Sequence, residues 1–136
     1  MPNARVDGVS IQKMLKGREV IVGMVRDEQF GPVMTFGLGG IFVEIMKDVS
    51  QMVAPLTRAE VVQLVRSIKA YPILTGARGR KPADVRALED FILTLAQIAM
   101  DFPEILELEV NPVIVGDEGQ GVGAVDALVT IRRDIL

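Results

Sequence analysis

The feature that most constrains the fold is the order of two kinds of hydrophobic periodicity. Apolar residues recur at the spacing of an α-helix in two central segments, residues 57–71 and 83–103. The segments on both sides have the composition typical of β-strands, and we expect these strands at residues 8–15, 19–27, 32–40, 105–115 and 122–134. This order predicts an α+β fold, in which two main helices pack against a mostly antiparallel sheet.

Both helices carry signals for their ends. Thr57 and Glu60 form a capping box at the first helix, and Pro72 is expected to end it. Pro103 is expected to end the second helix. Residues 74–82 between the helices form a basic loop, and "DEQFG" (residues 27–31) is typical of a hairpin loop. The segments 41–46 and 49–56 fit either strands or irregular structure.

The composition excludes several classes of function. The chain has 136 residues, of which 49% are hydrophobic and 24% charged, so we expect one globular domain over residues 1–136. No apolar run reaches membrane-spanning length and the first residues do not resemble a signal peptide. We therefore expect a cytoplasmic protein without a membrane partner. The net charge of −3 lacks the basic field that a nucleic-acid groove requires.

The chain has no cysteine and no histidine. Disulfides and thiolate metal sites are thereby excluded, and so are an imidazole-based catalytic triad and a zinc site that depends on histidine. Any bound metal must be held by oxygen ligands, which favours magnesium, manganese or calcium.

One strand gathers polar side chains on a single face. In "ELEVNPVIV" (residues 107–115), Glu107, Glu109 and Asn111 alternate with apolar residues. A tight turn centred on Glu118 and Gly119 would place Asn111 directly opposite the next carboxylate of the returning strand, about 5 Å away at Cβ.

That carboxylate is Asp126, the only charged residue in "VGAVDALVTI". A lone carboxylate in an apolar strand is costly to bury without a partner, and a bound Mg²⁺ would supply one. Glu109 could add a further ligand from the same face. An edge strand or bulge that merely meets water is the alternative, and a bulge in the turn would undo the pairing.

The segments "EVIVGM", "FGLGGIFVE", "LTGARGRKPAD" and "EVNP" occur in an order and spacing that resemble one family. It is the ATP-grasp domain of NDP-forming acyl-CoA synthetases, which includes ADP-forming acetyl-CoA synthetase and is related to the succinyl-CoA synthetase β subunit. The resemblance runs from about Gly8 to the C-terminus. It implies the C-terminal subdomain of the ATP-grasp fold, with ATP or ADP and Mg²⁺ as cofactors.

The resemblance also implies nucleotide-binding positions. The segment "QKML" resembles the hinge between the two ATP-grasp lobes, where backbone groups meet the adenine edge; its residues are Gln12, Lys13, Met14 and Leu15. Glu19 matches an acidic residue on the nucleotide side of the next strand. An ordinary strand end and a solvated strand terminus are the respective alternatives.

Further positions match the phosphate end of the family's site. Gly39 and Gly40 belong to a glycine-rich loop near the transferred phosphate, where glycine permits close backbone approach. Glu44 follows this loop and is the candidate catalytic residue. Its role would be to orient the glycine-rich loop. Arg78 would meet phosphate or a partner segment. The alternatives are a tight turn for the two glycines, a merely polar surface position for Glu44 and a solvated basic loop for Arg78.

The strongest match concerns the metal. Asn111 and Asp126 correspond to the two magnesium ligands of the succinyl-CoA synthetase type, in agreement with the hairpin geometry.

The sequence departs from the family in what it lacks. The upstream ATP-grasp lobe with its lid and lysine, the CoA-binding and ligase domains and a phosphorylated histidine are all missing. We therefore expect a nucleotide- and Mg²⁺-binding lobe that is incomplete alone, with those domains or subunits as partners. The alternatives are a degenerate ligand-sensing module of a protein acetyltransferase, or an interaction fragment that self-associates into a homo-oligomer through its exposed cleft face.

Overall fold

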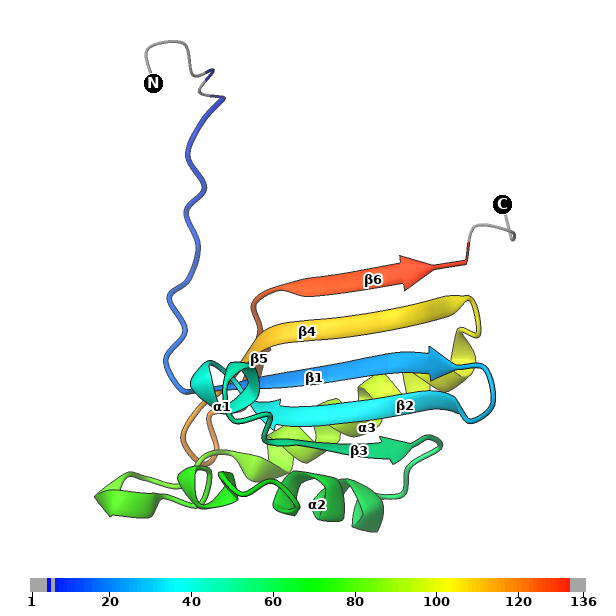
Figure 1. Cartoon of the computed structure of the whole chain (residues 1–136). Helices are drawn as coiled ribbons and strands as arrows, with labels where there is room; N and C mark the ends of the chain where they lie inside the picture. Colours follow the sequence, from blue (N-terminus) through cyan, green and yellow to red (C-terminus); the bar gives the residue numbers. More distant parts are fainter. Residues whose placement is uncertain (1–4, 6, 133–136) are drawn as a thin grey trace.

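The computed structural model describes residue 5 and residues 7–132. Its main feature is a six-stranded antiparallel sheet in the order β3-β2-β1-β4, with β5 and β6 both paired to the far edge of β4 (Figure 1). The strands are β1 (Arg18–Asp27), β2 (Gly31–Leu38), β3 (Val49–Val53), β4 (Ile105–Val115), β5 (Val122–Ala124) and β6 (Ala127–Ile131). The mostly antiparallel α+β fold predicted from the sequence is confirmed.

Two helices, α2 (Arg58–Arg66) and α3 (Val85–Asp101), cover one face of this sheet (Figure 1). A short helix, α1 (Ile41–Glu44), lies against the opposite face near the end of β2. Single 3₁₀ turns occupy Tyr71–Ile73 and Ala77–Gly79 in the connection between α2 and α3. None of the helices within residues 7–132 has the length and apolar character needed to cross a membrane.

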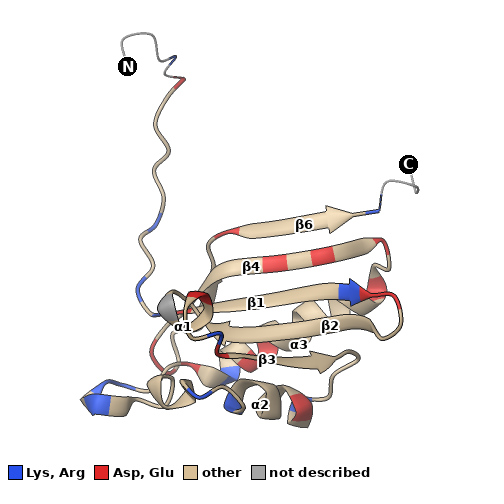
Figure 2. Ribbon diagram, in the orientation of Figure 1, with Lys and Arg blue, Asp and Glu red and all other residues tan. Residues whose placement is uncertain are grey.

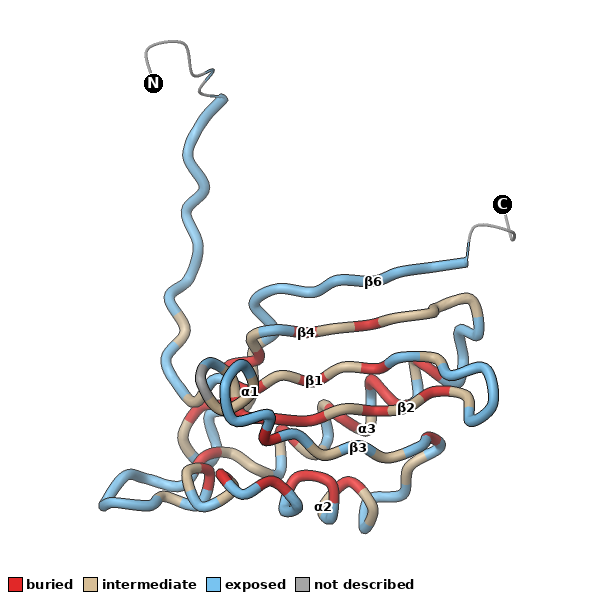
Figure 3. Tube along the Cα trace, viewed as in Figure 1, coloured by how far each residue is buried: buried red, intermediate tan, exposed pale blue. Residues whose placement is uncertain are grey.

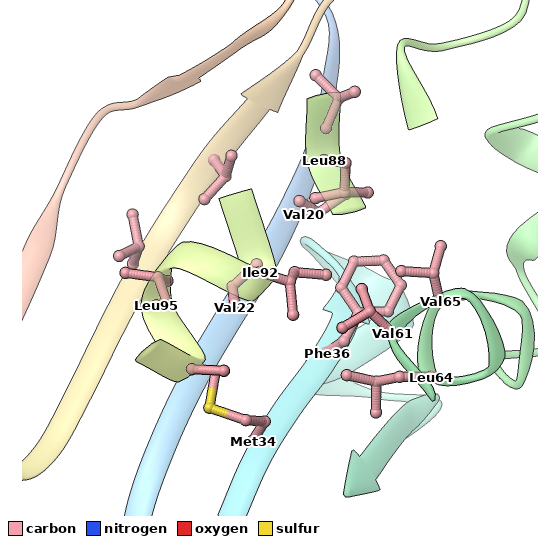
Figure 4. Close-up of a cluster of buried hydrophobic side chains, with 14 of the residues drawn as sticks. Val20, Val22, Met34, Phe36, Val61, Leu64, Val65, Leu88, Ile92 and Leu95 are labelled. Atoms are coloured by element: carbon pink, nitrogen blue, oxygen red, sulfur yellow. The ribbon is translucent and has the colours of Figure 1, made fainter. Parts of the chain in front are cut away.

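The core lies between the sheet and the two longer helices (Figures 3 and 4). Every second residue of β1 and β2 faces this layer, as the period of a strand requires. Each helix contributes one apolar stripe at a spacing of three or four residues. The residues labelled in Figure 4 that meet there are all buried: Val20, Val22, Met34, Phe36, Val61, Leu64, Val65, Leu88, Ile92 and Leu95.

The predicted capping box of α2 is confirmed. The backbone N–H of Thr57 donates to Glu60 Oε2 at 2.7 Å, and Thr57 Oγ1 accepts from the backbone N–H of Glu60 at 3.3 Å. The helix nevertheless ends at Arg66, earlier than expected. The buried Asp48 carboxylate explains this, because it accepts the N–H groups of Lys69 and Ala70 at 2.8 Å each. Those two amides are directed to a loop carboxylate, and the chain leaves the helix before Pro72.

Two strand predictions need correction. Residues 8–15 form no strand, and their apolar side chains Val9, Ile11 and Met14 are at least 83% exposed. The expected strand at 122–134 is interrupted at Val125 and Asp126, which separate β5 from β6. β6 ends at Ile131, and residues 133–134 of the prediction lie outside the described residues. The two segments left open are now defined, because residues 41–44 form α1 and residues 49–53 form β3.

Asp84 links the start of α3 to the turn between β4 and β5. Its Oδ2 accepts from the backbone N–H of Gly121 at 2.9 Å, and its Oδ1 from that of Ala87 at 3.1 Å. Hydrogen bonds from these two amides, Gly121 first, lower the pKa of the Asp84 carboxyl below its usual value. The charged carboxylate is therefore favoured in the folded state.

This geometry predicts a pH dependence of stability. Because the folded pKa of Asp84 is lowered, its contribution is fully present above the unfolded pKa of about 3.9 and is lost as the pH falls through the folded pKa. We expect the free energy of unfolding of the parent to exceed that of Asp84→Asn at neutral pH, and this difference to shrink in acid. Urea unfolding of both proteins at about pH 7 and about pH 3 measures it. An equal difference at both pH values would contradict the prediction.

Candidate functional site

The sheet face opposite α2 and α3 carries several of the residues that the sequence singled out. We call it the open face, defined by Glu19, Ile21, Gly23 and Val25 of β1, Gly37 of β2, and Glu107, Glu109, Asn111 and Ile114 of β4. These residues point away from α2 and α3 because the residues that alternate with them are buried in the core. Figure 2 shows acidic positions along β4. The helical layer thus leaves this face accessible.

Asn111 and Asp126 lie directly opposite each other at the centre of this arrangement. On one side of them Val113 pairs with Ala124, and on the other Val110 pairs with Ala127. The backbone N–H of Asn111 donates to the carbonyl oxygen of Asp126 at 3.0 Å. Both residues are exposed. The hairpin register predicted from the turn at Glu118 and Gly119 is confirmed.

The chain does contain a bulge, but not in the turn. The β1–β4 register shifts between Val20 and Val22, so that Asn111 and Pro112 together face Ile21. On the other edge of β4 the register continues unchanged across Asn111. The bulge therefore changes how β4 meets β1 and leaves the pairing of Asn111 with Asp126 intact.

The side chain of Asn111 is oriented by its neighbour Glu109. Asn111 Nδ2 donates to Glu109 Oε1 at 3.2 Å, which leaves Asn111 Oδ1 available as a ligand. Together with the carboxylate of Asp126, this arrangement offers oxygen atoms only. Such a donor set fits Mg²⁺, which takes one or two carboxylates from protein and completes its shell with water and phosphate. Within residues 7–132 no three acidic, histidine or cysteine side chains cluster as a metal site, so any ion here depends on additional ligands.

Glu19 belongs to a second row of residues across the open face, next to the row that contains Asn111 and Asp126. It pairs with Ile114 of β4, and its carbonyl oxygen accepts from the N–H of Gly39 at 2.8 Å. A Cβ at Gly39 would lie 3.1 Å from that of Glu19, which is tighter than an ordinary van der Waals contact, so glycine favours this close approach of the two segments. Gly40 has φ +64°, a left-handed conformation that also favours glycine. The glycine-rich loop therefore lies beside Glu19.

Glu44 ends α1 immediately after this loop. Its backbone N–H donates to the carbonyl oxygen of Gly40 at 3.0 Å, and its side chain is exposed. That side chain makes no hydrogen bond or ion pair with another residue in the described part of the chain. The structure thus places Glu44 next to the glycine-rich loop, where it is free to contact a ligand.

A pocket of about 470 Å³ opens beside this second row, which contains Glu19 and Ile114. Lys13, Met14 and Leu15 line one wall, and Ile114 and Gly123 line the other. Leu15 packs so closely on Gly123 that an added Cβ there would lie 2.5 Å from Leu15 Cδ1. Gln12, the remaining predicted hinge residue, is exposed and lies outside this wall. The hinge segment therefore meets the hairpin as an extended chain rather than as a strand.

Arg78 lies in a separate pocket of about 450 Å³, which it lines with Phe42 of α1, Ile73, Ala77 and Arg80. Arg78 itself adopts a left-handed conformation with φ 60°. The loop that carries it is fastened to the sheet by Arg18, whose guanidinium donates to Lys81 O and to Asp117 Oδ1. Phe42 belongs to α1, which follows the glycine-rich loop. The pocket of Arg78 therefore lies next to α1, and it is separate from the pocket that residues 13–15 line.

The structure brings four of the predicted residues, Glu19, Gly39, Asn111 and Asp126, into two adjacent rows across the open face. One row contains Gly39, Glu19, Ile114 and Gly123, and the next contains Gly37, Ile21, Asn111 and Asp126. The rows are three β4 residues apart, roughly 10 Å. Sequence reasoning did not identify Ile114 and Gly123 as pocket residues, although the hairpin register pairs them. The other predicted residues lie outside these rows. Glu109 lies farther along β4, Gly40 and Glu44 follow Gly39, and Lys13, Met14 and Leu15 line the neighbouring pocket, whereas Gln12 and Arg78 lie apart from it.

Comparison with known proteins adds an independent finding. Residues 1–131 match the model of a family described as ATP-grasp domain. The chain is 57% identical over 113 residues to the β subunit of acetate–CoA ligase [ADP-forming] I from Pyrococcus furiosus, which covers 82% of this chain and 49% of that subunit. It is 52% identical over 123 residues to acetate–CoA ligase [ADP-forming] I from Archaeoglobus fulgidus, covering 90% of this chain and 18% of that protein.

A solved structure agrees in fold. It is the dinucleotide forming acetyl-coenzyme A synthetase 1 of Ca. Korarchaeum cryptofilum, in complex with coenzyme A and Mg-AMPPCP, with a TM-score of 0.82 and 42% identity. The match covers 88% of this chain and 55% of that chain. The chain therefore spans about half the length of the Pyrococcus furiosus β subunit and of the solved Ca. Korarchaeum cryptofilum chain.

Proposed function

Because the chain belongs to the ATP-grasp domain family, we propose that it is the nucleotide- and Mg²⁺-binding lobe of an NDP-forming acyl-CoA synthetase. The complete protein would convert an acid, CoA and ATP to acyl-CoA, ADP and phosphate, and would run the reverse reaction. The observation that carries the proposal is the juxtaposition of Asn111 and Asp126 on the open face, one row from a pocket lined by the hinge segment.

The arrangement suits a nucleoside diphosphate that lies along β4. Backbone groups of residues 13–15, which line the pocket, would meet the adenine edge there, with Gln12 just outside it and Glu19 on the nucleotide side. The phosphates would then extend toward Asn111 and Asp126, a distance of roughly 10 Å along the strand. The related synthetase that was solved with Mg-AMPPCP supports a nucleotide as the ligand of this lobe.

Three features of the site would serve phosphoryl transfer. Asn111 Oδ1 and the Asp126 carboxylate would hold Mg²⁺, and Glu109 would keep the amide of Asn111 in place or add a ligand. The bound ion would neutralise charge on the transferred phosphate. Gly39 and Gly40 would allow the backbone to approach that phosphate, and Glu44 would orient their loop. Arg78 would contact phosphate or a segment of another domain from its neighbouring pocket.

The lobe does not carry the whole reaction. The sequence has no histidine to accept a phosphoryl group, and the relatives are about twice as long or longer. Further domains or subunits are therefore the expected partners, and they would supply the second wall of the cleft and the CoA chemistry.

Thermal unfolding of the chain with ADP, in the presence and absence of Mg²⁺, tests this proposal. A ligand that binds only the folded state stabilises it by about 2.7 kcal/mol at a hundredfold excess over its Kd. We expect the midpoint of unfolding to rise only when nucleotide and Mg²⁺ are both present. An equal rise with ADP alone would contradict the metal site, and no rise at any ADP concentration would show that this lobe alone does not bind nucleotide.

A further inference from the structure

Strand β6 forms an unprotected edge of the sheet. Among the described residues it pairs only with β4, and all five of its residues are exposed (Figure 3). The exposed fractions of its large apolar residues are 59% for Leu128, 49% for Val129 and 50% for Ile131. Soluble proteins usually protect such an edge with lysine, proline or a bulge, because unpaired strand groups recruit other strands. The sequence "ALVTI" contains no charged residue and no proline.

The backbone of β6 presents a regular set of unpaired groups at its outer side. The carbonyl oxygen of Asp126 accepts from Asn111, and the N–H of Arg132 donates to Glu104, so both even-numbered residues direct their groups toward β4. Neighbouring residues of a strand direct theirs to opposite sides. The N–H and C=O groups of Ala127, Val129 and Ile131 therefore point outward.

We propose that this edge binds the β6 of a second copy of the chain, in an antiparallel ladder centred on Val129. The central Val129 residues would exchange both of their backbone hydrogen bonds. Ala127 of each copy would do the same with Ile131 of the other. All outward groups of both strands are then satisfied, and the two sheets become continuous.

The charges flanking β6 favour this register and a copy of the same chain as the occupant. Asp126 and Arg132 lie three residues before and after Val129, so the ladder places Asp126 of each copy directly opposite Arg132 of the other. Opposite charges at directly opposed positions stabilise a pair of strands. A ladder centred on Leu128 or Thr130 would not place Asp126 opposite Arg132. It would also place at its centre a residue whose backbone groups are directed toward β4 and not toward the second copy. The edge is thus complementary to itself in both backbone and charge.

Exchanging the charges provides a sharp test. Sedimentation velocity at increasing protein concentration, without nucleotide or metal, should show a monomer–dimer equilibrium for the parent chain. Asp126→Arg and Arg132→Asp each replace both opposite-charge pairs by like-charge pairs, which should raise the dimer dissociation constant about tenfold or more. An equimolar mixture of the two variants restores both opposite-charge pairs, and should dimerise as well as the parent chain.

Two further variants separate the edge from other surfaces. Val129→Pro removes an outward N–H and leaves the β4 ladder intact, so dimerisation should be lost while the midpoint of thermal unfolding stays near that of the parent. Glu118→Arg reverses a charge in the exposed β4–β5 turn and should leave the dimer unchanged.

Three results would overturn the proposal. A parent chain that stays monomeric at every concentration would show that this edge does not bind a second copy. A dimer that persists in Val129→Pro would place the contact elsewhere, for example on the open face. Failure of the mixed charge variants to associate would reject the register. Because no ligand is present and Arg132 lies outside the candidate site, these outcomes are independent of the proposed nucleotide binding.

Discussion

Replacing Asp126 with alanine is expected to abolish the Mg²⁺-dependent stabilisation of the chain by ADP. The substitution removes the only carboxylate that lies directly opposite Asn111 in the hairpin. The amide oxygen of Asn111 and the Glu109 carboxylate, which accepts from Asn111 Nδ2, would then remain, and this is a weaker ligand set for a cation that prefers carboxylates. At an ADP concentration that stabilises the parent by about 2.7 kcal/mol, we expect the gain of the variant to fall close to zero. Thermal unfolding with Mg²⁺ and ADP measures both values.

The matched control for this experiment is Glu107→Ala. Glu107 is a carboxylate on the same face of β4, but it pairs with Thr130 and lies beyond Glu109 from Asn111. Its removal changes the net charge of the chain by the same amount as the loss of Asp126. We expect Glu107→Ala to keep the Mg²⁺-dependent gain. If both variants lose it equally, the general negative field of the face attracts the metal, and the assignment of Asp126 is wrong.

Truncating Phe36 to alanine is expected to lower the free energy of unfolding by about 3–5 kcal/mol, the usual cost of deleting a buried aromatic side chain. Phe36 is fully buried, and Figure 4 shows its ring between β2 and the stripe of α2 that contains Val61 and Val65. The loss has two physical parts, because apolar surface is no longer removed from water and a cavity remains where the ring packed. Urea unfolding of parent and variant, analysed with a common m-value, measures the difference.

The chain offers a control of the same residue type. Phe30 lies in the turn between β1 and β2 and is 66% exposed. Phe30→Ala should therefore change the free energy of unfolding by no more than about 0.5 kcal/mol. Similar losses for the two variants would show that the layer between β2 and α2 is not the core of the folded protein.

The central strands and the two longer helices could be predicted from the sequence for local reasons. Strand-like composition predicted β1 and β2, and helical spacing with the Thr57–Glu60 capping box predicted the start of α2. The β4 hairpin was predicted down to its register, because the tight turn at Glu118 and Gly119 fixes which residues lie opposite each other. In each case the decisive signal lies within a few residues of the element itself.

The features that were missed depend on contacts between distant segments. The early end of α2 reflects Asp48, which takes the amides of Lys69 and Ala70 from some twenty residues earlier in the chain. Residues 8–15 have apolar positions that suit a strand, but in this structure no neighbouring strand pairs with them. A propensity is realised only where tertiary partners exist.

The residues of the candidate site also differ in whether local signals or distant contacts bring them together. Asn111 and Asp126 were found because a single hairpin brings them together. The approach of Leu15 to Gly123 and of Gly39 to Glu19 depends on contacts between segments that are distant in the sequence. The positions of Leu15, Gly39 and Glu19 in the site were therefore expected only from the family resemblance, and that of Gly123 was not expected. Their roles in binding nucleotide stay predictions that the unfolding experiments address.

The pairing of β1 with β4 also has a topological consequence. These two strands lie next to each other at the centre of the sheet, yet α2, α3 and the basic loop between them all lie in the chain that separates the two strands. The ladder therefore closes one long loop that contains the whole helical layer. The entropy of closing such a loop grows only with the logarithm of its length, at about 0.6 kcal/mol for each doubling. A few residues inserted into the exposed segment 77–82 would thus cost little closure entropy, whereas separating β1 from β4 would release both helices at once.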